Sequence, residues 1–176
     1  MSGGQESRLT VSQEHQRQIV AFQLGTELYG LEIGIIHTVI APQPITRVPK
    51  TPDYILGVMN LRGRIVPILD LGLRFGLPAE SLGESSAQRI VIVDTGTTTA
   101  GLRVDSISEV ITLPESAIQA PSGLIATRNI DFITGIGRIP RRDNGGESEQ
   151  IILLLDIERA ILPDANLPAI NGKSAA

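Results

Sequence analysis

The chain has 176 residues, of which 41% are hydrophobic and 19% charged, and its formal net charge is −4. These proportions fit a folded protein of one domain, or of two small lobes that share a core. No lysine- or arginine-rich run is present, which argues against nucleic-acid binding, and the lack of cysteine excludes disulfides and thiol nucleophiles. The first 18 residues lack the apolar core of a signal peptide, and no apolar run is long enough to span a membrane. We therefore expect a soluble cytoplasmic protein without direct membrane insertion.

Most of the predicted elements are short strands, which follow a polar tail (1–18) that we expect to be disordered. The β-branched run RQIVAFQL is followed by the hairpin signal GTE. Ile33, Ile36, Val39 and Ile40 lie at helical spacing and predict a short helix with one apolar stripe. The segment ITRVPKTP then predicts a short strand ended by prolines.

The stretch GVMNLRGRIVPILDL, residues 57–71, has the features of a tight hairpin. Two apolar runs flank a short turn that Gly63 permits, and Arg62 stands at its tip. Pro67 in the second run indicates a sheet edge or a bulge, because proline removes a donor from the strand ladder. Asp70 ends this run and could cap a helical turn. The tip arginine is either a solubilising charge or part of a recognition surface, and both interpretations stay open on residue chemistry alone.

The second half of the chain repeats the first. Residues 19–40 align without a gap with residues 90–111, and further on Asp70 aligns with Asp156. Two copies of one unit, each made of short strands with turn signals, predict two small closed barrels. Because a unit of this size is marginal alone, the two lobes should share apolar surface.

We therefore predict a mainly β protein with short helices and a C-terminal helical segment, DIERAIL. The folded domain spans residues 19–162, with lobes at approximately 19–80 and 88–162, and strands could be exchanged between them. The glycine- and serine-containing stretch between the lobes is interpreted as a linker. Residues 163–176 are expected to form a flexible C-terminal tail.

A catalytic site is not expected. His15 lies in the polar tail, and His37 lacks a second metal ligand or a nucleophile nearby in the sequence. Asp70 and Asp156 could form an acid/base pair, but helix capping explains both, since each stands where a strand gives way to a helical turn. Without cysteine no common zinc site can form, and a phosphate-binding glycine loop is not found. We therefore predict no catalytic residue, no metal ligand and no cofactor.

Several stretches together resemble the CheW family of chemotaxis coupling proteins. They are YGLEI, ITRVPKTPDYILGVMNLRGRIVPILDL, GLRVDSISEVI, and ITGIGRI followed by ILLLDIERAIL. The similarity runs from about residue 19 to 162. The same domain ends the chemotaxis histidine kinase and begins the CheV proteins. Since the sequence contains neither a kinase core nor a receiver domain, the stand-alone adaptor is the better match.

The resemblance implies two SH3-like five-stranded β-barrel lobes and no catalysis. It implies an adaptor that couples the cytoplasmic tips of methyl-accepting chemoreceptors to the regulatory domain of the CheA histidine kinase and is recruited to membrane-associated receptor arrays. A coupling protein of a pilus-motility or other chemosensory pathway would have the same sequence features. A small hydrolase or nucleotide enzyme, the alternative from another class, lacks support because no nucleophile–base set is found.

The same resemblance implies three sets of contact residues. The receptor groove would involve Ile33, Ile36, Val39, Gly57, Asn60, Leu61 and Arg62. The kinase face would involve Ile45, Arg47, Leu56 and Ile65. The contact that closes the rings of a receptor array would involve Gln119 and Leu124. Two positions depart from the family pattern: Thr38, where an acidic residue that can pair with the turn arginine is common, and Gly72, where arginine is usual.

Overall fold

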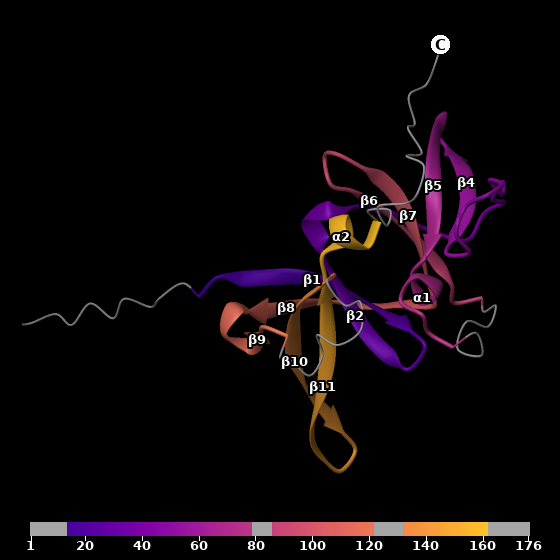
Figure 1. Ribbon diagram of the computed structural model, residues 1–176. Helices are drawn as coiled ribbons and strands as arrows, with labels where there is room; N and C mark the ends of the chain where they lie inside the picture. The colour runs from indigo at the N-terminus through magenta and orange to yellow at the C-terminus, as the bar shows by residue number, and fades with distance from the viewer. Residues whose placement is uncertain (1–13, 79–85, 122–131, 162–176) are drawn as a thin grey trace, which may run out of the picture.

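The computed structural model describes residues 14–78, 86–121 and 132–161, and strands dominate it (Figure 1). The elements of the first half are β1 (Gln16–Leu24), β2 (Glu27–Glu32), the 3₁₀ turn η1 (Ile33–Ile35), β3 (Ile36–Ile40), β4 (Ile55–Leu61), β5 (Arg64–Asp70) and α1 (Leu71–Arg74). Those of the second half are β6 (Arg89–Asp94), β7 (Thr99–Val104), β8 (Ser106–Pro114), η3 (Glu115–Ala117), β9 (Ile118–Gln119), β10 (Ile133–Asp143), β11 (Gly146–Leu155) and α2 (Ile157–Ile161).

The strands form two sheets that do not follow the two halves of the sequence. One sheet has the order β8-β1-β2-β11-β10-β9, and the other has the order β3-β6-β7-β5-β4. The β1–β2 hairpin therefore lies among strands of the second half, and the β6–β7 hairpin lies among strands of the first half (Figure 1). We call the six-stranded unit lobe A and the five-stranded unit lobe B. Each lobe combines the first hairpin of one repeat with the later strands of the other.

The internal repeat extends to the strand register at the centre of each sheet. In lobe B, β5 pairs in parallel with β7 so that Ile68 lies opposite Gly101. In lobe A, β11 pairs in parallel with β2 so that Leu154 lies opposite Gly30. Both glycines are tightly enclosed, since an added Cβ would come within 2.4 Å of an isoleucine methyl carbon at either position. The two lobes are therefore copies of one packing arrangement.

Each sheet curls toward closure. In lobe B, the chain leaves β3 at one edge and returns to β4 at the other through a bridge between Thr46 and Val58, with backbone hydrogen bonds of 2.8 and 2.9 Å. In lobe A, an ion pair of 3.9 Å joins Arg141 on β10 to Glu109 on β8. Closure protects strand edges that would otherwise be open to aggregation. The predicted mainly β fold with two small barrel-like lobes is confirmed.

Each lobe has a small core of its own, and the two lobes share a larger one. The interior of lobe A contains Ile19, Ala21, Leu28, Leu113, Ile152 and Leu154. The interior of lobe B contains Met59, Val66, Ile68, Ile90 and Ile92. The shared core draws buried residues from both lobes, including Phe22, Leu31, Leu69, Leu102, Phe132 and Leu155. This arrangement gives each small unit apolar contact that it could not supply alone.

A row of aromatic rings runs through the shared core. Phe22, Tyr29, Phe75 and Phe132 contact one another in that order, with ring centroids 6.2, 5.5 and 4.3 Å apart. Burial raises the pKa of Tyr29, and its hydroxyl donates a hydrogen bond of 2.7 Å to Glu27 Oε2, which raises it further. The phenol therefore stays neutral, and its hydrogen bond joins two residues of β2 at the edge of the shared core.

Two expectations about secondary structure are wrong. The segment ITRVPKTP does not form a strand, because its only pairing is the isolated bridge from Thr46 to Val58. Residues 33–40 do not form a helix with a single apolar stripe, because Ile33–Ile35 form one 3₁₀ turn and Ile36–Ile40 form strand β3. The segment is rich in β-branched residues, which favour strands, and apolar spacing over so short a run fits either state. Along β3, the exposed residues His37 and Val39 alternate with half-buried neighbours. The apolar side chains of this segment therefore point to different sides.

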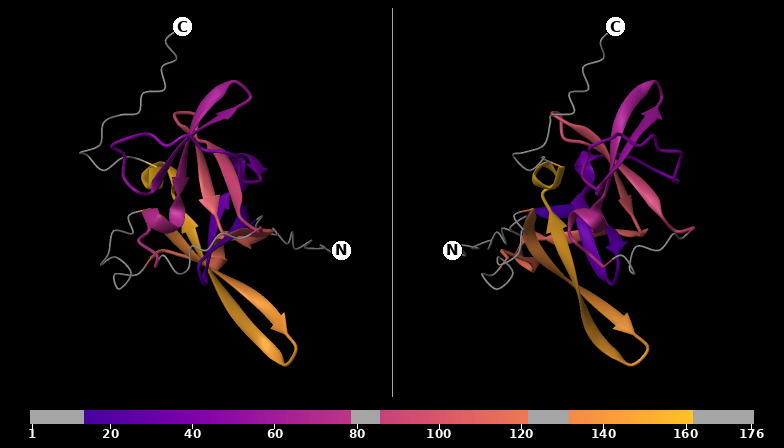
Figure 2. Two further views of the ribbon diagram at one scale, coloured as in Figure 1. Left: turned by 90° about the vertical axis from the view of Figure 1, so that its right-hand side faces the viewer. Right: turned by 45° about the vertical axis from the view of Figure 1, so that its right-hand side comes forward.

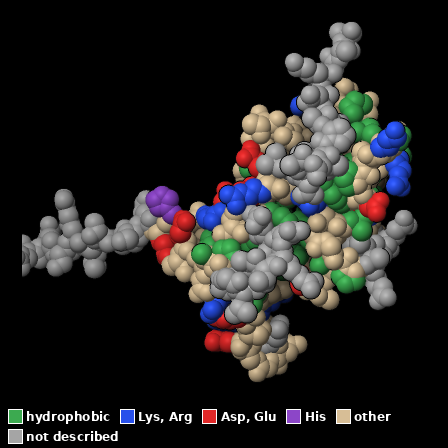
Figure 3. Space-filling view, in the orientation of Figure 1, with side chains coloured by type: hydrophobic (Ala, Val, Ile, Leu, Met, Phe, Trp, Pro, Cys, Tyr) green, Lys and Arg blue, Asp and Glu red, His purple; other side chains and the backbone are tan. Residues whose placement is uncertain are grey.

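Two hairpins project from the body of the molecule (Figure 2). The β4–β5 hairpin is short, whereas the β10–β11 register continues out to Asp143 and Gly146, well past the residues that pair with β2 or β9. In Figure 3, acidic and basic side chains lie side by side on this longer hairpin, where Arg138 and Glu149 form an ion pair of 3.9 Å. Among the described elements, no helix is long and apolar enough to cross a membrane.

Candidate functional site

The β4–β5 hairpin closes with the tight turn that the sequence predicted. Leu61 pairs with Arg64, so Arg62 and Gly63 alone make the turn, and their φ values of 50° and 84° are those of a two-residue type I′ turn. Asn60 supports the turn, because its Oδ1 accepts a hydrogen bond of 2.8 Å from the Gly63 amide. The Arg62 side chain is exposed, and no other described residue forms a hydrogen bond or ion pair with it.

Gly57 has a structural role beneath the loop that precedes β4. It is buried, its φ is 141°, and an added Cβ would lie 2.1 Å from the carbonyl oxygen of Thr46. This close approach lets Thr46 pair with Val58 on β4. Gly57 therefore shapes the loop that carries Ile45 and Arg47, and it has no side chain to offer a partner.

The four residues expected at the kinase face lie on β4, β5 and the loop before them. Ile45 and Leu56 are half-buried against the core of lobe B, whereas Arg47 is exposed. Ile65 on β5 is 66% exposed, more than any other large apolar side chain in the described part of the chain. It lies opposite Asn60 in the strand register. Residues expected to serve the kinase and the receptor therefore meet on one hairpin.

The apolar wall expected to face the receptor is divided between η1 and β3. Ile33 on η1 and Val39 on β3 are 41% and 40% exposed, whereas Ile36 packs against the shared core. Strands β3 and β4 form opposite edges of the lobe B sheet. Thr38 on β3 is half-buried and makes no hydrogen bond to Arg62. The wall and the arginine turn therefore lie on different elements, and Thr38 is not the partner of Arg62.

The residues expected at the ring contact belong to lobe A. Gln119 lies on the short strand β9 and pairs with Ile136 of β10, at the edge of the sheet. Its side chain is exposed. Leu124 lies outside the described residues.

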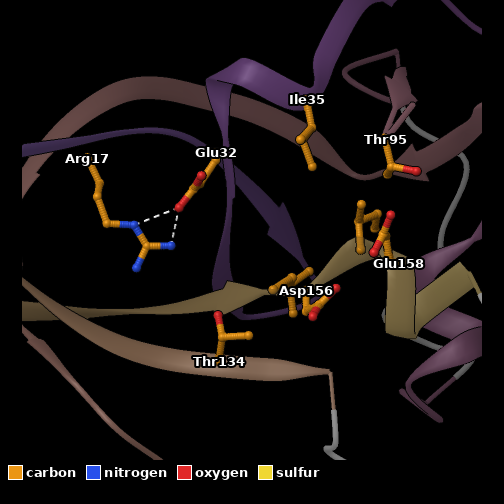
Figure 4. Close-up of a pocket in the computed structure, with 9 residues that line it drawn as sticks. Arg17, Glu32, Ile35, Thr95, Thr134, Asp156 and Glu158 are labelled. Atoms are coloured by element: carbon orange, nitrogen blue, oxygen red, sulfur yellow. Dashed lines mark hydrogen bonds and ion pairs between the residues drawn. The ribbon is translucent and has the colours of Figure 1, made fainter. Parts of the chain in front are cut away.

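A pocket near the junction of the two lobes was not predicted from the sequence (Figure 4). It has a volume of ≈ 340 Å³. Its polar lining consists of Arg17, Glu32, Thr95, Thr134, Asp156 and Glu158, and its apolar lining consists of Ile35, Leu155 and Ile157. These residues come from β1, β2, η1, the β6–β7 turn, β10, and the junction of β11 with α2. Because Ile35 and Ile33 share the η1 turn, the pocket adjoins the exposed apolar wall.

Three carboxylates line this pocket, and each has a partner at its margin. Arg17 donates from Nε to Oε1 of Glu32 at 2.7 Å and forms an ion pair with it. Glu158 accepts a hydrogen bond of 3.2 Å from a threonine hydroxyl in the β6–β7 turn. Asp156 accepts from the Arg159 amide at 3.3 Å and lies 3.5 Å from the Arg159 guanidinium. With three carboxylates and one arginine in its lining, the pocket is acidic.

Asp70 occupies in lobe B the position that Asp156 occupies in lobe A. Its Oδ1 accepts a hydrogen bond of 2.9 Å from the Leu73 amide, which caps α1, and its Oδ2 accepts one of 2.9 Å from Arg103 Nε. The predicted capping role of both aspartates is confirmed. Sequence reasoning missed Arg103 as the partner of Asp70. The repeat alignment matches Arg103 with Glu32, but it could not show that Arg103 contacts Asp70, because that contact depends on the pairing of β5 with β7.

The side chains that could ligate a metal ion are not clustered in the described part of the chain. Over residues 14–78, 86–121 and 132–161, no three His, Asp or Glu side chains are grouped to hold a metal ion. His37 is exposed on β3. The features that stand out are surfaces: the arginine turn, the exposed Ile65, the divided apolar wall and the acidic pocket.

Comparison with known proteins gives one consistent result. Residues 18–162 match the family model of the CheW-like domain. The chain is 32% identical over 152 residues to "Chemotaxis protein CheW" of Klebsiella aerogenes, covering 86% of this chain and 83% of the relative. It is also 32% identical over 152 residues to "Chemotaxis protein CheW" of Helicobacter pylori, covering 86% and 85%.

A solved structure agrees with the sequence relatives. The chain is similar to the crystal structure of the scaffolding protein TtCheW from Thermoanaerobacter tengcongensis, with a TM-score of 0.69 and 37% sequence identity. The similarity covers 81% of this chain and 90% of that one. Both lobes are therefore included in the likeness.

Proposed function

The chain belongs to the CheW-like family of chemotaxis scaffold proteins, and on this premise we propose that it couples chemoreceptors to a CheA-type histidine kinase as a non-enzymatic adaptor. It would bind the cytoplasmic tips of methyl-accepting receptors with one surface and the regulatory domain of the kinase with another. A hydrolase or nucleotide enzyme is not favoured, because the family consists of scaffolding adaptors.

The observation that carries this proposal is the β4–β5 hairpin. It presents Ile65, 66% exposed, together with the exposed Arg62 at its tip. A large exposed apolar side chain next to polar neighbours is typical of a protein–protein contact. The closed sheet of lobe B and the Asn60–Gly63 hydrogen bond hold the hairpin in place, so little ordering is needed on binding.

The kinase would meet the side of the hairpin that carries Ile65. The neighbouring loop is fixed on β4 by the Thr46–Val58 bridge, so the exposed Arg47 stands at a defined place beside it. Ile45 and Leu56 lie half-buried under this surface, so they would mainly hold the surface in place rather than contact the partner. Gln119, on β9 of lobe A, would serve the second contact that closes a ring.

The receptor tip, a helical hairpin, would lie along the junction of the lobes. A helix bound in a groove presents apolar residues at regular spacing, and the exposed Ile33 and Val39 offer it apolar surface. Arg62 would donate hydrogen bonds to receptor carboxylates or carbonyls in a fork geometry that lysine matches poorly.

The test is a three-component co-sedimentation with receptor-containing membranes, a CheA-type kinase and this chain. We expect more kinase to sediment with the membranes when the chain is present. We also expect the chain to sediment with the membranes when the kinase is omitted. If the chain binds neither receptor membranes nor the isolated kinase regulatory domain, the proposed function is wrong.

A further inference from the structure

The two repeats differ in charge at one structurally equivalent place. In lobe B, Asp70 and Arg103 lie opposite each other at the end of the β5–β7 pairing and form an ion pair. The register of lobe A brings Asp156 and Glu32 to the corresponding ends of β11 and β2. An acid therefore stands where the arginine of lobe B stands, and Glu32 turns toward Arg17 instead. No strand of lobe A supplies the guanidinium that covers the equivalent aspartate in lobe B, and the arginine nearest to Asp156 among the described residues is Arg159 on α2, whose 63% exposed side chain lies 3.5 Å away.

The acidic pocket lies at this place in lobe A. Both Asp156 and Glu32 line it, and Glu158 on α2 adds a third carboxylate (Figure 4). The side chain of Asp156 is 33% exposed, whereas that of Asp70 is 4% exposed beneath Arg103. The carboxylate of Asp156 thus stays partly accessible beside the exposed Arg159, whereas its counterpart is covered.

We propose that this pocket binds an arginine side chain of the receptor tip, whose guanidinium takes in lobe A the place that Arg103 takes in lobe B. The internal repeat provides the precedent, since the same aspartate position already holds a guanidinium within this chain. The choice of the receptor as partner rests on the proposed function. The pocket adjoins η1, whose exposed Ile33 belongs to the expected receptor wall.

The chemistry of the lining selects arginine over other side chains. Ile35, Leu155 and Ile157 provide apolar contact for the methylene stem, while carboxylates receive the charged head. A planar guanidinium can donate to two carboxylates at once, which an ammonium group on a flexible stem does less well. The lining is negative on balance, so a cation is attracted and an anion repelled.

The first experiment probes the pocket without any partner. The ¹⁵N-labelled full chain is titrated with N-acetyl-arginine amide and, in parallel, with the uncharged isostere N-acetyl-citrulline amide. We expect saturable shifts of the backbone amides of Thr95, Thr134 and Glu158 with the arginine compound only. Equal shifts with the citrulline compound, or no saturable shift with the arginine compound, would overturn the proposal.

Variants then assign the binding to the carboxylates. The double variant Asp156→Asn/Glu158→Gln should bind the arginine compound about tenfold more weakly, the loss expected for a charge-assisted hydrogen bond. Asparagine retains an oxygen that can cap α2, so the fold should persist. If the double variant fails to fold, Glu158→Gln alone, at an exposed position, carries the test. The matched control Glu147→Gln/Glu149→Gln removes the same charge from the β10–β11 hairpin and should bind like the parent.

Co-sedimentation with receptor membranes tests the partner. The double variant should bind receptors about tenfold more weakly than the parent and the hairpin control should not. If the parent binds receptors and the double variant binds them equally well, this inference is wrong although the proposed function stands. If the parent binds the arginine compound but no receptor, the proposed function fails, and with it the receptor as the source of the arginine.

Discussion

Arg62 is held in a backbone conformation that disfavours an arginine. Its φ of 50° lies in the left-handed region, which costs a residue with a Cβ roughly 1–2 kcal/mol. Asparagine and glycine are the residues that two-residue turns of this type prefer. Turn stability alone would therefore favour asparagine at this position. The strain points to a role of the arginine side chain in recognition.

Replacing Arg62 with asparagine should separate stability from binding. We expect Arg62→Asn to leave the free energy of unfolding unchanged or to raise it by up to about 1 kcal/mol, because asparagine tolerates the left-handed region. Receptor affinity should fall by about 1–3 kcal/mol, the range for losing a charge-assisted hydrogen bond. Melting curves and receptor co-sedimentation measure the two effects. Arg64→Gln, which removes the neighbouring exposed charge, is the control. Normal binding together with a much lower melting temperature would make Arg62 a structural residue.

Gly57 should resist any side chain. In Gly57→Ala the methyl group would meet the Thr46 carbonyl oxygen, in a backbone region that alanine rarely adopts. We expect the free energy of unfolding to fall by roughly 2–4 kcal/mol in urea denaturation. Gly34→Ala is the matched control, because nothing lies within 4 Å of its added Cβ. Equal denaturation midpoints for the two variants would show that the loop does not rest on Gly57.

At the scale of elements, the hairpins β4–β5 and β10–β11 are counterparts that have diverged. Ile65 and Ile151 hold equivalent positions, since each precedes its capping aspartate by the same number of residues, and both are exposed, at 66% and 57%. Their cross-strand neighbours differ: Asn60 stands opposite the first and Arg138 opposite the second. The pair therefore offers a matched test of which lobe meets the kinase.

Ile65→Asp should weaken binding of the kinase regulatory domain by about 2–4 kcal/mol, because a buried charge without a counter-ion opposes an apolar contact. Ile151→Asp should leave this affinity unchanged. Both positions are exposed, so neither substitution should lower stability by more than about 1 kcal/mol. Calorimetric titration gives the affinities. The opposite result, with Ile151→Asp impaired and Ile65→Asp normal, would move the kinase face to lobe A.

The ion pairs at the strand ends should differ in their contribution to stability. Arg103→Met leaves the carboxylate of Asp70, 4% exposed, without its counter-ion, and should destabilise the fold by about 3–5 kcal/mol. Arg17→Met breaks a pair whose side chains are 29% and 51% exposed and should cost about 0–1 kcal/mol. Chemical denaturation of the two variants provides the comparison. If the two variants lose similar amounts of unfolding free energy, the Asp70–Arg103 pair is no more important to stability than the Arg17–Glu32 pair.

At the scale of the whole molecule, the repeat was readable from the sequence but the assembly of the lobes was not. Alignment identifies equivalent segments, yet either first hairpin could join either set of later strands, because Gly30 and Gly101 fit the same kind of central position. The turn at Arg62 was predicted because it is local, and the capping aspartates for the same reason. The acidic pocket was not, because its lining comes from both ends of the chain and from the β6–β7 turn, which the fold brings together.

If this one chain links receptor and kinase, it should make the kinase respond to the receptors. Autophosphorylation of a CheA-type kinase is measured in the presence of receptor-containing membranes, with and without the chain. We expect kinase activity to depend on the receptors only when the chain is present, and Arg62→Asn and Ile65→Asp each to weaken this dependence. Kinase activity that responds to the receptors equally well without the chain, or that does not respond to them in its presence, would show that the chain is not the link.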